Sequence, residues 1–98
     1  MQILISVRHT HLTEGEKSVV EEKLAKYEKK VSDLTKIEVT FNLEGDRHLL
    51  ELNFHVAHHN PLVARTEAPS NLAALDLGIQ KMDNLVSKMN GKRNDHHK

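Results

Sequence analysis

Residues 36–56 read KIEVTFNLEGDRHLLELNFHV, and this stretch decides the fold. Apolar and polar side chains alternate on both sides of a turn at residues 45–47. The apolar positions are Ile37, Val39, Phe41, Leu43, Leu50, Leu52, Phe54 and Val56. Because successive side chains of a strand point to opposite faces of a sheet, the pattern predicts a β-hairpin with one buried and one solvated face.

The flanking segments extend this sheet and add two helices. A strand is predicted over residues 2–7, and a helix over 14–31 with Thr13 and Glu16 as its capping box. After a turn at residues 59–61 we expect a short strand over 62–67. A final helix is expected to begin at Ser70 as N-cap and to end at Gly91.

The predicted order is therefore β-α-β-β-β-α, an α+β fold. The simplest packing places both helices on the apolar face of a four-stranded sheet. We expect one domain over residues 1–91 and a flexible basic tail over residues 92–98.

Composition narrows the class of protein. The chain has 98 residues and no cysteine, which suits one small domain without disulfides or thiolate chemistry. The apolar stretch at residues 3–7 is too short for a membrane span or a signal peptide. A cytoplasmic protein without membrane contact is expected.

The net charge is zero, but its distribution along the chain is uneven. Residues 23–30 contain four lysines and one glutamate, and residues 81–98 contain five basic and two acidic side chains. The remainder of the chain is acidic. Two local concentrations of positive charge favour a polyanionic partner.

Helical spacing arranges most of these cations in rows. Lys23, Lys26 and Lys30 form one row on the first helix; Lys81 and Lys88 form another, which Lys92 roughly continues. We predict that the two rows flank a groove spaced for phosphates, although lysine rows are also ordinary solvated helix surface. Further candidates for RNA contact are Lys29, Arg93 and Arg8.

The aromatic residues indicate the kind of RNA contact. Tyr27, Phe41 and Phe54 are the only ones, and all fall on predicted core faces. Without an exposed ring to stack on unpaired bases, contact with the phosphates of structured RNA is favoured.

Metal binding and catalysis are weaker interpretations. His55, His58 and His59 gather near a turn, but no helical histidine pair or fixed carboxylate supports them, so we expect no metal and no cofactor. His55 should reach the open sheet face, near Arg65 or Glu67. The exposed carboxylates there (Glu38, Glu51, Glu67) are interpreted as charges that keep the open sheet face soluble. We therefore expect that the protein is not an enzyme.

Three segments carry a resemblance to a known family. They are residues 1–6 (MQILIS), residues 24–29 (LAKYEK), and residues 73–76 (AALD) leading to residues 80–82 (QKM). In this order and spacing the chain resembles the short ribosome hibernation-promoting factors and ribosome-associated inhibitor A (protein Y), also called sigma-54 modulation proteins.

The resemblance implies a fold related to double-stranded RNA-binding domains. It implies binding to ribosomal RNA in the decoding cleft of the small ribosomal subunit, where messenger and transfer RNA are excluded during stress or stationary phase. The family's basic helix positions match Lys23, Lys26, Lys29, Lys81 and Lys88, whereas Asn84 stands where relatives commonly carry a basic residue.

The ending of the chain, short and mildly basic, resembles the short hibernation-promoting type and implies a monomeric free protein. The alternative function, from a different class, is a protein–protein adaptor for sigma-factor modulation. It would act through the open sheet face or the edge strand.

Overall fold

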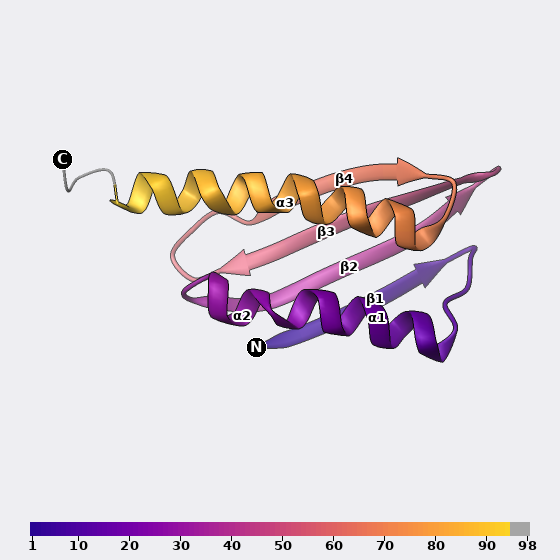
Figure 1. Cartoon of the computed structure of the whole chain (residues 1–98), viewed down its shortest axis with the longest axis horizontal. Coiled ribbons are helices and arrows are strands. Elements are labelled where there is room, and N and C mark those ends of the chain that lie inside the picture. Colours follow the sequence, from indigo (N-terminus) through magenta and orange to yellow (C-terminus); the bar gives the residue numbers. More distant parts are fainter. Residues whose placement is uncertain (95–98) are drawn as a thin grey trace.

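The computed structural model describes the backbone of residues 1–94 and the side chains of residues 1–91. Its elements are β1 (Gln2–Arg8), α1 (Glu14–Ala25), α2 (Tyr27–Lys30), β2 (Leu34–Glu44), β3 (Arg47–Val56), β4 (Leu62–Ala68) and α3 (Asn71–Asn94). The four strands form one sheet in the order β1-β2-β3-β4. The helices cover one face of this sheet (Figure 1), so the predicted α+β architecture is confirmed.

The hairpin β2–β3 has the predicted register. Glu44 pairs with Arg47, and the ladder continues to Ile37 opposite Phe54. Gly45 has a φ of 62°, and Asp46 is not among the residues with positive φ. A positive φ at only the first central residue matches a type II′ turn, whose twist suits a hairpin.

The two outer strands attach differently. β4 pairs with β3 in antiparallel orientation, whereas β1 pairs with β2 in parallel orientation. A parallel pair needs a crossover connection, and α1 with α2 provides it. As a result, α1 and α3 run in the same direction across the sheet (Figure 1).

Both predicted N-caps are present. The Thr13 hydroxyl accepts a hydrogen bond from the Glu16 N–H at 3.1 Å, and the Glu16 carboxylate accepts one from the Thr13 N–H at 2.9 Å. The Ser70 hydroxyl accepts a bond from the Ala73 N–H at 3.2 Å. Each cap satisfies N–H groups that the first helical turn leaves without partners.

The predicted helix ends need two corrections. The helix predicted over 14–31 is interrupted at Lys26, which keeps right-handed helical angles, so α2 follows directly as one short extra turn. Gly91 does not end α3, which continues to Asn94. A glycine cap requires a positive φ, and among the described glycines only Gly45 has one. The boundary expected at residue 92 thus falls inside a helix, and residues 95–98 lie outside the described residues.

The core lies between the sheet and the helices. Tyr27, Phe41 and Phe54 are all buried, as predicted, and the rings of Tyr27 and Phe54 meet edge to face with centroids 4.9 Å apart. From the helices, Val20 and Leu24 of α1 face this layer. The corresponding residues of α3 are Leu75, Met82, Val86 and Met89.

A buried asparagine holds the beginning of α3 against the loop before α1. The Asn71 amide donates to the Thr10 hydroxyl at 3.2 Å and to the His11 carbonyl at 3.3 Å. Its amide oxygen lies 2.7 Å from Nδ1 of His48, which therefore donates. This network ties the starts of both helices to the same end of the molecule.

Gly78 allows α3 to approach the sheet. A Cβ atom built on Gly78 would lie 2.5 Å from Cδ2 of the buried Leu50, whereas one built on Gly91 meets nothing within 4 Å. We therefore expect Gly78→Val to destabilise the protein by about 1–3 kcal/mol through overpacking. Gly91→Val, the same exchange in the same helix, should change stability by less than about 0.5 kcal/mol. Urea unfolding followed by circular dichroism measures both, and equal midpoints would contradict the close approach.

Candidate nucleic-acid interface

The lysines in the last turn of α1, in α2 and in the second half of α3 lie on segments that run toward the same end of the molecule. Both helices run toward the end that holds the turn between β3 and β4 (Figure 1). The cations along them are Lys23, Lys26, Lys29, Lys30 and Lys88, and all except the half-buried Lys23 are exposed. We call these five lysines the basic end. Lys92 and Arg93 follow in the last turn of α3, and their side chains lie outside the described part.

Helix electrostatics favours cations at this end. The C-terminus of a helix carries a partial negative charge from its unpaired carbonyl groups. Lys23 lies in the last turn of α1, and Lys29 and Lys30 lie in the last turn of α2. The helix termini therefore favour Lys23, Lys29 and Lys30, whereas Lys88 lies six residues before the end of α3 and outside its last turn.

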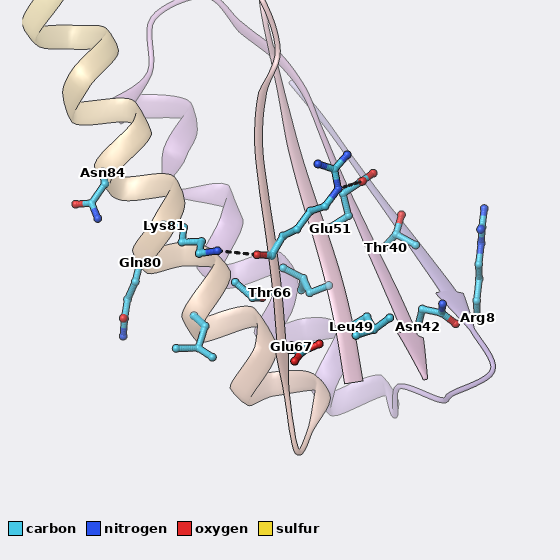
Figure 2. A pocket seen from close by; sticks show the side chains of 13 residues that line it. Arg8, Thr40, Asn42, Leu49, Glu51, Thr66, Glu67, Gln80, Lys81 and Asn84 are labelled. Carbon is cyan, nitrogen blue, oxygen red and sulfur yellow. Dashed lines mark hydrogen bonds and ion pairs between the residues drawn. The ribbon is translucent and has the colours of Figure 1, made fainter. Parts of the chain in front are cut away.

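The groove between two lysine rows is not formed as predicted. The edge of α3 that faces α1 carries acids: Lys23 Nζ lies 2.6 Å from Asp76, and the Tyr27 hydroxyl lies 2.5 Å from Asp83. At 100° per residue, Lys81 and Lys88 share a row on the opposite edge of α3. Lys81 accordingly reaches β4, where its Nζ donates to the Arg65 carbonyl at 2.9 Å (Figure 2).

Tyr27 of α2 links this helix to α3 at the seam. Its ring is buried, its hydroxyl donates to Asp83, and Lys30 Nζ lies 5.7 Å from the ring centroid. Burial raises the pKa of the Tyr27 hydroxyl far above its ordinary range, and the nearby Asp83 carboxylate raises it further. Tyr27 therefore stays a protonated donor at physiological pH. The seam, formed by Lys23 with Asp76 and by Tyr27 with Asp83, was missed from the sequence.

Arg8 is not brought together with the basic end. It is the last residue of β1, pairs in register with Asn42, and lies on the open face of the sheet. Figure 1 places the end of β1 near the start of both helices, away from their C-terminal ends. Any contact that Arg8 makes with RNA would belong to a second surface.

The charges of the open sheet face are largely paired with one another. Arg65 donates to Glu51 at 2.8 Å, and Arg47 pairs with Glu67. His55 points to the open sheet face as predicted, but its partner there is Glu38, 2.6 Å away, and not Arg65 or Glu67. Within the described residues, no group of three or more potential ligands could hold a metal ion.

A depression of about 820 Å³ wraps the edge strand β4, with Arg8, Leu49, Arg65, Glu67, Leu77 and Lys81 among its lining residues (Figure 2). Of its lining cations, Arg65 is bound to Glu51 and Lys81 donates to the Arg65 carbonyl, and the carboxylates Glu51 and Glu67 also line it. We therefore assign no polyanion site to it.

Comparison with known proteins identifies the family. Residues 3–94 match the family of the sigma 54 modulation protein / S30EA ribosomal protein, and the chain belongs to this family. This confirms the resemblance seen in the sequence. None of the helices within residues 1–94 is long and apolar enough to cross a membrane.

Individual relatives agree with this assignment. A ribosome hibernation promoting factor of Azotobacter vinelandii is 29% identical over 93 residues, which cover 95% of this chain and 86% of that protein. A ribosomal subunit interface protein from Coxiella burnetii superposes with a TM-score of 0.80 at 16% identity, over 93% of this chain and 99% of that one. The N-terminal domain of Thermus thermophilus Protein Y superposes with a TM-score of 0.76 at 20% identity, over 91% of this chain and 99% of that one. These two structures share the fold.

The hydroxyl of Tyr27 can be titrated alone, because the chain has one tyrosine and no tryptophan. We expect tyrosinate absorbance of the native protein to appear only above the ordinary pKa of about 10. Asp83→Asn should lower the pKa of Tyr27, although burial should keep it raised. Because the folded pKa is raised, the neutral phenol stabilises the fold below about pH 10, and this contribution is lost as the pH rises through the folded pKa. An ordinary wild-type pKa, or no response to Asp83→Asn, would contradict the buried contact.

Proposed function

We propose that this protein is a ribosome hibernation factor that binds ribosomal RNA of the small subunit through its basic end. Membership of the family supports the ribosome as partner. The observation that carries the proposal is that Lys23, Lys26, Lys29, Lys30 and Lys88 all lie on helical segments that run toward the same end of a chain without net charge. Lys81, Lys92, Arg93 and Arg8 remain further candidates for RNA contact.

The chemistry of the surface favours contact with phosphates. Lysine ammonium groups act as point charges toward phosphate oxygens and read no base sequence. All three aromatic rings are buried, so none can stack on an unpaired base. Recognition would therefore depend on the shape and charge of folded RNA, which suits an RNA-lined cleft.

The proposed mechanism is steric. Bound in the decoding cleft, the domain would occupy the space of messenger and transfer RNA and block both without catalytic turnover. The elongated shape, 48 × 22 × 18 Å, is compatible with insertion into a cleft. In this proposal the protein acts in the cytoplasm and is a monomer when free. It uses no cofactor and catalyses no reaction.

Co-sedimentation with bacterial ribosomes through sucrose gradients tests the proposal. Each phosphate neutralised by a lysine releases counterions, so binding should weaken steeply as salt increases. We expect comigration with the small subunit at low salt and release at high salt. Absence of the protein from all ribosomal fractions at low salt would overturn the proposed function.

A double charge reversal tests whether the basic end is the contact surface. Lys26 and Lys88 are exposed and come from different helices. We expect Lys26→Glu with Lys88→Glu to weaken ribosome binding by roughly 10- to 100-fold, because two phosphate contacts become repulsive.

Lys17→Glu with Arg47→Glu is the matched control for this reversal. It makes the same change of net charge at the opposite end, where Lys17 faces Glu14 and Arg47 faces Glu67. Circular dichroism verifies that both variants fold. Equal loss of affinity in the two variants would show that net charge, rather than the basic end, governs binding.

A further inference from the structure

One lysine of the basic end already has an anionic partner inside the protein. Lys23 Nζ lies 2.6 Å from an oxygen of Asp76, a residue of α3 that is 53 positions away in the sequence. A carboxylate oxygen and a phosphate oxygen accept the same charge-assisted hydrogen bond from an ammonium group. Asp76 thus accepts from Lys23 a hydrogen bond of the kind that a phosphate oxygen could also accept.

The contact is open to exchange. The side chain of Lys23 is 37% exposed and that of Asp76 is 55% exposed, so both can be reached from solvent. An ion pair of this exposure contributes little to folding, and its loss should leave the fold intact. The neighbouring acid differs, since Asp83 binds the neutral hydroxyl of Tyr27 and not a lysine.

We infer that Asp76 is an internal competitor for RNA phosphate at Lys23 and thereby limits the affinity of the protein for RNA. This inference rests on the proposed function and concerns how tightly the basic end binds. Non-specific RNA binding depends almost entirely on the number of phosphates neutralised. Pairing of Lys23 with Asp76 therefore lowers the affinity for all RNA. Binding to unrelated RNA is weakened together with binding to the ribosome.

A removal of the competing charge tests the inference. Asp76→Asn keeps the size of the side chain and frees Lys23. We expect ribosome binding to become about two- to fivefold tighter, the range that corresponds to an exposed ion pair. If Lys23 gains a phosphate contact, a plot of log affinity against log salt should steepen by about 0.7–0.9. A purely structural role of Asp76 would not move this slope.

Two further variants separate local competition from net charge. Asp46→Asn makes the identical exchange in the β2–β3 turn, on a different element from the Lys23–Asp76 pair, and should leave the slope unchanged. Lys23→Gln removes the cation for which Asp76 competes, so adding Asp76→Asn to Lys23→Gln should bring no further gain. The wild type, Asp76→Asn, Lys23→Gln and the double variant of these two form a double-mutant cycle whose interaction free energy isolates the pair.

The outcomes are distinct. If the wild type binds ribosomes but Asp76→Asn has the same affinity and salt slope as the wild type or as Asp46→Asn, the inference is overturned. The proposed function still stands in that case. A gain that persists after Lys23→Gln also overturns it, because Asp76 would then act on other cations. Absence of wild-type binding at low salt overturns the proposed function and the inference with it.

Discussion

The burial of one face of the β2–β3 hairpin is the constraint on which the rest of the structure depends. Ile37, Val39, Phe41, Leu52 and Phe54 lie at most 1% exposed beneath the helices. A shift of register by one residue would turn this entire set into water, so the pairing of the two long strands is strongly specified. The helices then have only one apolar surface on which to pack, and their placement follows from the sheet.

The strand order determines the directions of the helices and therefore where their lysines lie. The parallel pairing of β1 with β2 requires a crossover, and the resulting path makes α1 and α3 run in the same direction. Had the helices been antiparallel, one C-terminus would lie at each end, and the lysines in the last turns would be divided between them. Parallel helices instead carry the lysines of residues 23–30 and Lys88 toward the same end. The proposed RNA-binding surface thus depends on the topology and not on the composition alone.

The sequence predicted the helices and strands better than it predicted which edges of the helices lie next to each other. Strand alternation, the capping residues Thr13 and Ser70, and the burial of Tyr27 are local properties, so pattern and propensity sufficed. Helical spacing also placed Lys81 and Lys88 in one row of α3. What the spacing lacked was the identity of the neighbour on each edge of α3, which depends on strand order. The lysine edge lies over β4 and the acidic edge meets α1. Gly91 failed as a helix end because glycine permits a positive φ without requiring one.

A protein without net charge can bind RNA because screening makes charge a local property. At physiological ionic strength the Debye length is about 8 Å, whereas the molecule is 48 Å long. Glutamates near the start of α1 therefore barely weaken the field around Lys29 and Lys88. Asp76 and Asp83 differ, because they lie within hydrogen-bond distance of side chains in the lysine-bearing segment. Of these two, Asp83 is engaged by a neutral hydroxyl and only Asp76 directly neutralises a lysine. The electrostatics of RNA binding should therefore depend on a few contacts at the α1–α3 seam more than on the overall balance of acidic and basic residues.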